Sequence, residues 1–443
     1  MLKASWSDVS FAPWLTKIDR TVTIEYQSMR NVFDQYEQPE NRLTHAFMVS
    51  LEKDRTLLKA FLKWIEAERV PPVSSIQLAE QEVPGFYKSS DDKSERKGLP
   101  DGFIYSREWA VLIESKVQSR LSKDQLDRHQ KTAERSGFVD VQLVAITVDP
   151  FKGKLTPNSK VILWTSIYQW LGNFPKSEWA RDLRQYMEIF EQNMVLSDYQ
   201  IRGTVTVFDG FHFDQDNPYT YNEGKRLIRL LGDELQVHPS LVKLGVDPKG
   251  KRRGQITGKQ GELVWDFLPL KWPGKSGAFT STPHLTLTVR RNIASTGATI
   301  PNGIRGGFKS KLSRLGCEGF TDIVLGIEEA LRPVCKKSKN ARPVLQLVQR
   351  HYKSQSSPAT VDGRMEFDIR SLVPGTRSHQ KHQPQWIEAM YDVLTNKRSN
   401  MQFGLEVFFN YDCPVLRSRH AINLFAEAMQ AIYPLFSILE TDS

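Results

Sequence analysis

The chain has 443 residues and a net charge of +9, with 40% hydrophobic and 25% charged residues, which is typical of a soluble globular protein of two or three domains. It contains no run of roughly 18 uncharged apolar residues, and its N-terminus lacks a charged head followed by an apolar stretch, so we expect neither a membrane span nor a signal peptide. The three cysteines (Cys317, Cys335 and Cys413) are odd in number and never form a CxxC pair, which favours a reducing compartment, the cytoplasm, and argues against a structural zinc site.

The N-terminal part predicts one α/β unit that begins with two helices. Apolar residues recur at helical spacing over residues 39–53 and again from residue 54 to the Pro71-Pro72 pair. Residues 73–83 alternate between apolar and polar side chains, as in a half-exposed strand, and the charged stretch 87–98 is typical of a loop.

A hairpin and a helix follow in the sequence. The apolar runs 100–105 and 109–117 are separated by only three residues and predict two paired strands. Residues 122–137 predict a helix, in which Ser122 and Gln125 form a capping-box pattern.

Two further buried strands are expected over residues 141–148 and 161–166, and helices over about 166–171 and 179–194 complete the unit. The resulting order is helix, strand, strand, strand, helix, strand. This αβββαβ order predicts a mixed sheet with helices on both faces.

The polar stretch 196–206 has no apolar period, so we place a domain boundary near residue 200, between a domain 1–200 and a domain 201–443. The second domain predicts an α+β fold, and its motifs match no family that we recognise. Its expected helices cover about 220–236, 308–332, 384–396 and 418–436, and its expected strands 285–291 and 402–411.

The positive charge is concentrated in the second domain. Residues 1–200 hold 27 basic and 28 acidic residues, whereas residues 243–311 alone hold 13 basic and 3 acidic ones. Such a segment favours a polyanion partner, although a solvated basic surface explains it equally well. Trp265 and Trp272 are candidates for base stacking, although core tryptophans are commoner. The expected phosphate contacts are Lys249, Lys251, Arg252, Arg253, Lys259, Arg290 and Arg291.

Three charged residues meet at one end of the predicted hairpin. Glu114 and Lys116 project from the same side of their strand, because successive side chains alternate between faces. If the hairpin turns near residues 107–108, Asp101 lies opposite or diagonal to Glu114. Two carboxylates repel each other unless a hard divalent cation lies between them, so this pattern indicates a Mg²⁺ site.

The "PD" at residues 100–101 and the "ESK" at 114–116, on strands that precede a helix, resemble the PD-(D/E)XK motif of the restriction-endonuclease-like nucleases. The resemblance covers roughly residues 35–170, and the αβββαβ order agrees with that family's core. It implies a metal-dependent nuclease in the N-terminal domain only.

The resemblance also implies roles for individual residues. Asp101 and Glu114 would hold Mg²⁺, with Mn²⁺ as a substitute, and the backbone carbonyl of Ser115 would be a further ligand. Lys116 would position the attacking water and stabilise charge on the phosphate.

Two looser features of the family match other positions. Glu40, on the first core helix, matches a helical acidic residue that often faces the metal, and Gln125 matches a frequent polar residue near the lysine. The stretch "QLDRH" resembles a Q-x-x-x-Y motif but has His129 where tyrosine is usual, which leaves His129 in doubt.

Simpler explanations stay open for each residue. Triplets of the E-x-K type are common, and Asp101 precedes a glycine as many turn residues do. Glu40 would also suit a helix N-terminus, and Gln125 would also suit a capping box. The pair His379 and His382 lacks nearby carboxylate or cysteine partners in the sequence.

The hypothesis is therefore a Mg²⁺-dependent nuclease with a basic C-terminal domain that binds nucleic acid, DNA being favoured over RNA. By analogy, such a protein resembles prokaryotic restriction or anti-phage endonucleases. The alternative is a non-catalytic nucleic-acid-binding or regulatory protein with a nuclease-like fold. The sequence is also compatible with a homo-oligomer.

Overall fold

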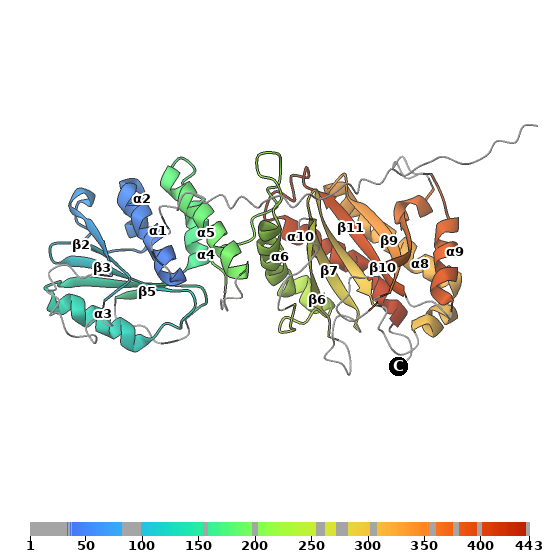
Figure 1. Cartoon of the computed structure of the whole chain (residues 1–443), viewed down its shortest axis with the longest axis horizontal. Helices are drawn as coiled ribbons and strands as arrows, with labels where there is room; N and C mark the ends of the chain where they lie inside the picture. The colour runs from blue at the N-terminus through green and yellow to red at the C-terminus, as the bar shows by residue number, and fades with distance from the viewer. Residues whose placement is uncertain are drawn as a thin grey trace, which may run out of the picture.

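The computed structural model describes two units, each with its own sheet (Figure 1). The described residues are Phe33, Tyr36, 38–81, 99–151, Gly153, 158–196, 203–253, 262–271, 282–301, 308–351, Lys353, 360–374, 381–396 and 401–439. The boundary expected near residue 200 lies outside them.

The first unit contains a mixed five-stranded sheet in the order β1-β2-β3-β4-β5. Its strands are β1 (Gln77–Glu80), β2 (Gly102–Ser106), β3 (Trp109–Lys116), β4 (Asp140–Thr147) and β5 (Ser159–Leu163). Strands β1, β2 and β3 pair antiparallel, whereas β3, β4 and β5 pair parallel. The predicted mixed sheet is confirmed.

Helices cover both faces of this sheet. They are α1 (Pro39–Lys53), α2 (Arg55–Trp64), α3 (Lys123–Arg135), α4 (Trp164–Leu171) and α5 (Glu178–Leu196). On one face, Ile113 of β3 belongs to the core that includes Phe47 of α1, and on the other Leu112 packs in a core with Leu126 of α3. This two-sided burial explains why β3 reads as an unbroken apolar run.

Three local expectations need correction. The strand expected over 73–83 is a 3₁₀ turn (Val73–Ser75) followed by the short β1, since Pro72 accepts the turn's hydrogen bond from the Ser75 amide. The strand expected over 161–166 is β5 (Ser159–Leu163), because α4 begins at Trp164. Although Ser122 precedes α3 as expected, its side chain makes no capping hydrogen bond.

The second unit contains a six-stranded antiparallel sheet in the order β10-β9-β11-β8-β7-β6. Its strands are β6 (Leu263–Pro269), β7 (His284–Arg290), β8 (Ile293–Ile300), β9 (Arg342–His351), β10 (Thr360–Asp368) and β11 (Met401–Asn410). Its helices are α6 (Tyr221–Gln236), α7 (Pro239–Leu244), α8 (Phe308–Lys337), α9 (Gln385–Thr395) and α10 (Ala421–Ile432).

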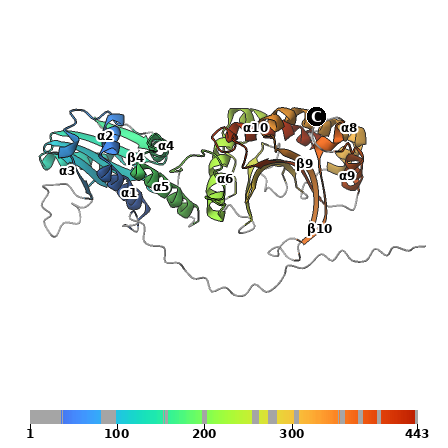
Figure 2. The same cartoon turned by 90° about the horizontal axis from the view of Figure 1, so that it is seen from above.

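This second sheet is strongly curved, and its labelled helices lie on the convex side (Figure 2). One core joins inward residues of the strands, such as Leu287 and Leu405, to α10 residues such as Phe425. The apolar stretch Ala421–Leu439 is long enough to cross a membrane by length and composition, but 61% of it is buried inside the protein, as in a core helix.

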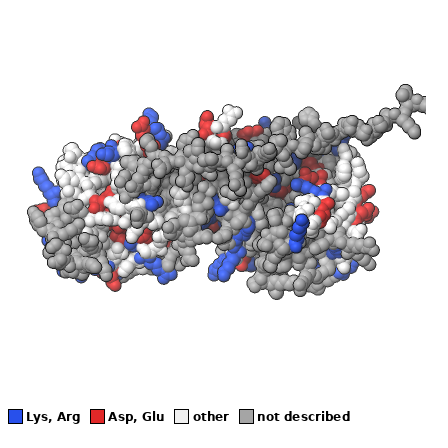
Figure 3. Space-filling view, viewed as in Figure 1, with Lys and Arg blue, Asp and Glu red and all other residues white. Residues whose placement is uncertain are grey.

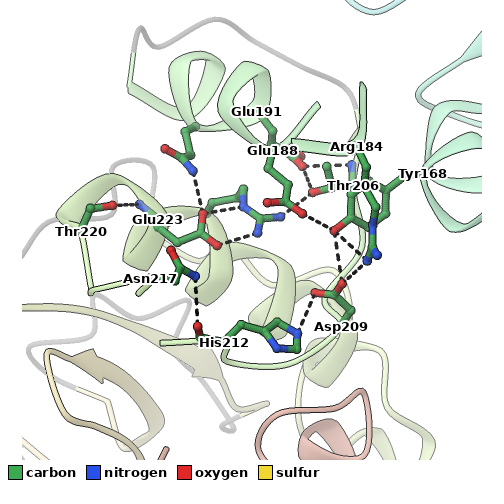
Figure 4. A network of polar contacts seen from close by, with 12 residues as sticks. Tyr168, Arg184, Glu188, Glu191, Thr206, Asp209, His212, Asn217, Thr220 and Glu223 are labelled. Carbon is green, nitrogen blue, oxygen red and sulfur yellow. Dashed lines mark hydrogen bonds and ion pairs between the residues drawn. The ribbon is translucent and has the colours of Figure 1, made fainter. Parts of the chain in front are cut away.

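A buried polar network joins the two units (Figure 4). Glu191 of α5 accepts hydrogen bonds from the backbone amides of Val205 (3.3 Å) and Thr206 (3.0 Å), which precede α6. Arg226 of α6 donates to the Thr206 hydroxyl (2.9 Å), and Arg184 of α5 pairs with Asp209. Burial raises the pKa of the Glu191 carboxyl. The segment after residue 202 is therefore fixed to both helices by hydrogen bonds and charge pairs.

Candidate active site

The β2–β3 hairpin brings the predicted acidic residues together. Gly102 pairs with Ile113 in the antiparallel register, so the preceding Asp101 lies across from Glu114. The turn comprises Arg107 and Glu108, and Arg107 adopts a positive φ of 50°. The expected hairpin is therefore confirmed, and its turn leaves the two carboxylates on neighbouring strands.

Glu114 is the centre of the cluster and is almost completely buried, with 1% of its side chain exposed. Its Oε1 atom lies 2.6 Å from Lys116 Nζ and accepts a hydrogen bond from Gln125 Nε2 (2.5 Å). Its Oε2 atom lies 2.9 Å from Nε2 of the fully buried His129. A buried carboxylate needs such partners, because an unpaired buried charge is strongly unfavourable.

Asp101 has a different environment. Its Oδ2 atom accepts a hydrogen bond from the backbone amide of Ser115 (2.8 Å). Burial, followed by repulsion from Glu114, raises the pKa of the Asp101 carboxyl to about 7. The Ser115 amide and Lys116 oppose this rise without cancelling it. The two carboxylates therefore resist carrying two negative charges at once.

Lys116 remains a cation in this environment. Burial alone would lower the pKa of the Lys116 ammonium, but the attraction of Glu114, Asp101 and Glu40 taken together outweighs it, with Glu114 contributing most of the three. The net shift of the pKa is upward. Lys116 is therefore a positively charged hydrogen-bond donor at the C-terminal end of β3, close to both acidic side chains.

Glu40, in the first turn of α1, holds the chain that follows β3. Its Oε1 atom accepts hydrogen bonds from the backbone amides of Val117 (3.0 Å), Gln118 (2.8 Å) and Ser119 (2.9 Å), and from the Ser119 hydroxyl. Burial alone would raise the pKa of Glu40, but these amides lower it overall. Glu40 therefore orders the segment after Lys116, a role that its position in the sequence did not indicate.

The helix α3 supplies two side chains to Glu114. Gln125 and His129 are four residues apart and so lie on the same face of the helix. Gln125 bonds Glu114, not the helix end, so the capping-box explanation of Gln125 is wrong. The structure brings His129, which the sequence left in doubt, into the cluster. The four-residue spacing in "QLDRH" was the signal for both.

The donors at this site fit a small hard cation held by two carboxylates. Among the residues that the structure describes, no three His, Cys, Asp or Glu side chains are grouped to hold one ion. Mg²⁺ is commonly bound through one or two carboxylates with water and phosphate oxygens, so Asp101 and Glu114 are the candidate ligands here. A cation between them would remove the repulsion that raises the pKa of Asp101.

The predicted phosphate contacts in the second unit have different environments. Lys249, Lys251 and Arg291 are exposed. Arg252 is instead tied into the fold, because its guanidinium pairs with Asp266 (2.9 Å) and Asp233 (3.0 Å) and only 10% of its side chain is exposed. We therefore withdraw Arg252 as a surface contact.

Two other predicted contacts pack beside the sheet. The Arg253 guanidinium lies 3.9 Å from the centre of the Trp265 ring, and Arg290 lies 3.5 Å from Glu406. Lys259, Trp272 and His379 fall outside the described residues, and His382 is exposed. In Figure 3, blue and red side chains are interspersed where the surface is coloured.

Comparisons with known proteins do not extend these observations. No family model, no curated protein and no solved structure matches the chain.

Proposed function

We propose that this protein is a Mg²⁺-dependent nuclease that hydrolyses phosphodiester bonds, with a PD-(D/E)XK core in its first unit. The observation that carries the proposal is the cluster at the end of the β2–β3 hairpin. There, two carboxylates face each other across neighbouring strands, and the Lys116 ammonium lies 2.6 Å from one of them, Glu114. An ordinary surface ion pair does not require two carboxylates in so buried a place.

Each residue of the cluster has a role in this proposal. Asp101 and Glu114 would hold Mg²⁺, or Mn²⁺ in its place, together with the Ser115 carbonyl. The bound ion supplies positive charge to the phosphate and lowers the pKa of a water molecule. Lys116 donates hydrogen bonds to the attacking water and to a phosphate oxygen, which orients the water and stabilises the developing charge.

The remaining polar residues act through these three. Gln125 and His129 hold the Glu114 carboxylate in one orientation from the side of α3. Glu40 fixes the backbone of the segment after β3 and thereby limits the movement of Lys116. They are positioning residues, comparable to the outer groups that orient metal ligands.

DNA is the substrate that we favour over RNA, in a cytoplasmic restriction or anti-phage role that rests on the resemblance alone. The excess of basic residues over 243–311 supports a polyanionic substrate. The exposed residues Lys249, Lys251 and Arg291 would contribute to its binding.

The test is cleavage of supercoiled plasmid, linear DNA and RNA by the purified full chain, with Mg²⁺ or with EDTA. We expect Mg²⁺-dependent cleavage that falls by about 10²–10³-fold or more in Asp101→Asn and Glu114→Gln. Asp127→Asn is the matched control, because Asp127 is in the same unit but lies on the surface of α3, where it pairs with Lys123. Wild-type activity in either cluster variant, with the fold intact by circular dichroism, would overturn the assignment.

A second candidate is a non-catalytic nucleic-acid-binding protein on the same scaffold. The contacts of Glu114 favour it, because Oε1 is paired with Lys116 and Gln125 and Oε2 lies 2.9 Å from His129 Nε2, so protein groups surround the carboxylate. This candidate predicts nucleic-acid binding that is equal in Mg²⁺ and in EDTA, with no cleavage of any of the three substrates.

A further inference from the structure

The concave side of the second sheet forms a groove of about 490 Å³. This concave side of the sheet is opposite the side on which the labelled helices pack (Figure 2). Its described lining comes from all six strands of the sheet and includes side chains from β6 at one edge and β10 at the other. The volume is within the range of roughly 300–1,000 Å³ that small-ligand sites occupy.

The hollow follows from the alternation of side chains along each curved strand. On β7, Leu285, Leu287 and Val289 point into the helix-covered core, so Thr286 and Thr288 point into the groove. Side chains crowd together on the concave side of a bent sheet. Small residues therefore keep the centre open.

Cationic side chains lie toward both sides of the groove. Arg290 of β7 is on one side, and Arg350 of β9 and Arg364 of β10 are on the other. The indole of Trp265 on β6 also lines it, with the Arg253 guanidinium over its ring. Guanidinium groups bind phosphate with directed hydrogen bonds, and aromatic rings stack on bases.

The floor between these arginines carries a fixed hydrogen-bond acceptor. Glu406 of β11 is buried, and its carboxylate accepts hydrogen bonds from Ser295 (2.5 Å) and Gln346 (3.1 Å). Arg290 lies 3.5 Å from it, and the neighbouring Gln402 accepts a hydrogen bond from Arg350 (2.6 Å). The polar groups are therefore held in defined positions instead of lying freely in solvent.

We propose that this groove binds an unpaired nucleotide of a single-stranded DNA segment. The arginines on the two sides would contact phosphates, and Trp265 would contact the base. Glu406, Gln346 and Gln402 would form hydrogen bonds with the pairing edge of the base. In duplex DNA that edge is already paired with the opposite strand. The inference rests on the proposed function, because it assigns the second unit a part of the same substrate.

Other occupants fit the lining less well. The groove, at about 490 Å³, is too small to hold a double helix. The phosphates of a duplex would therefore remain outside the groove, away from its arginines. An acidic peptide would match the arginines, but not the combination of an aromatic ring with a row of hydroxyl and amide groups. Single-stranded nucleic acid uses all three kinds of group.

The test is binding of a short fluorescent single-stranded oligonucleotide to the full chain in EDTA, measured by anisotropy over a range of salt concentrations. Arg364→Ala is the variant, because 52% of the Arg364 side chain is exposed and its partner Glu366 is 42% exposed, so the substitution buries no unpaired charge. Arg332→Ala is the matched control, since Arg332 is 54% exposed and also paired with a glutamate, but it belongs to α8.

We expect Arg364→Ala to weaken single-strand binding about tenfold, as the loss of one charge-assisted contact does. The salt slope should fall by roughly 0.7 for that contact. Arg332→Ala should change neither, and unlabelled duplex or a poly-glutamate peptide should compete poorly. Equal binding by both variants, or equally good competition by duplex or by the peptide, would overturn the proposal.

The two proposals fail separately. If the groove is assigned correctly and the nuclease is not, Arg364→Ala weakens binding in EDTA while the wild type cleaves nothing in Mg²⁺. If the nuclease is assigned correctly and the groove is not, Mg²⁺-dependent cleavage is present and Arg364→Ala binds as Arg332→Ala does. A parallel titration uses single-stranded RNA of the same length. At least tenfold weaker binding of RNA supports a DNA site, whereas equal binding of RNA and DNA contradicts it.

Discussion

Replacing Asp101 with asparagine removes one of two carboxylates that repel each other. Asparagine is nearly the same size, and its side-chain oxygen can still accept the hydrogen bond from the Ser115 amide. The substitution therefore tests charge with little change in packing. We expect Asp101→Asn to make the metal-free protein more stable at neutral and alkaline pH, while cleavage is lost.

The magnitude follows from the pKa of Asp101. The pKa rises from its ordinary value of 3.8 to about 7 in the folded chain, so folding favours the protonated form. The stability of the folded chain that depends on a protonated Asp101 is fully present below about pH 4 and is lost as the pH rises through 7. The difference between the two pKa values corresponds to roughly 4 kcal/mol, an upper value for the gain at pH 8. At pH 5 the same calculation gives a gain in the free energy of unfolding of Asp101→Asn of roughly 1–2 kcal/mol.

Urea unfolding in EDTA at pH 5 and pH 8 measures both gains, and Asp127→Asn is the control. Asp127 forms an i,i+4 pair with Lys123 on the surface of α3, so its loss should change stability by no more than about 0.5 kcal/mol. Millimolar Mg²⁺ should stabilise the wild type more than Asp101→Asn. The reasoning is refuted if Asp101→Asn is no more stable than the wild type at pH 8, or if its gain is the same at both pH values.

Three further substitutions follow from the contacts of single side chains. Lys116→Ala should lose cleavage but keep its affinity for Mn²⁺ in calorimetry, since a cation beside the ion is removed; a collapse of metal binding would make Lys116 structural. Gln125→Ala should lower both turnover and Mn²⁺ affinity about 10–100-fold. Ser122→Ala should change neither, because the Ser122 side chain makes no capping hydrogen bond. Equal effects of the two substitutions would contradict this prediction. Arg252→Ala should destabilise the second unit by about 3–5 kcal/mol in urea, because it leaves a buried aspartate unpaired, and Lys251→Ala, on the exposed neighbour, should leave stability unchanged.

The sequence by itself predicted the elements around the candidate site. Alternation and apolar runs are local patterns, and they are enough to predict β2, β3 and α3 and the order of the elements. Because strand side chains alternate, the spacing of Glu114 and Lys116 also implied a shared face. The short connection between the strands then brought Asp101 opposite Glu114, as the register confirms.

Only the tertiary structure decided which partner each polar side chain takes. Glu40 accepts hydrogen bonds from amides 77 to 79 residues later in the sequence, and local sequence patterns do not predict contacts at such a separation. The neighbours Lys251 and Arg252 look alike in the sequence, yet one is exposed and the other is paired with Asp266. Likewise, the groove exists because six strands between residues 263 and 410 pair into one curved sheet. Backbone periodicity is set by neighbouring residues, whereas burial and pairing depend on the chain segments that folding brings together.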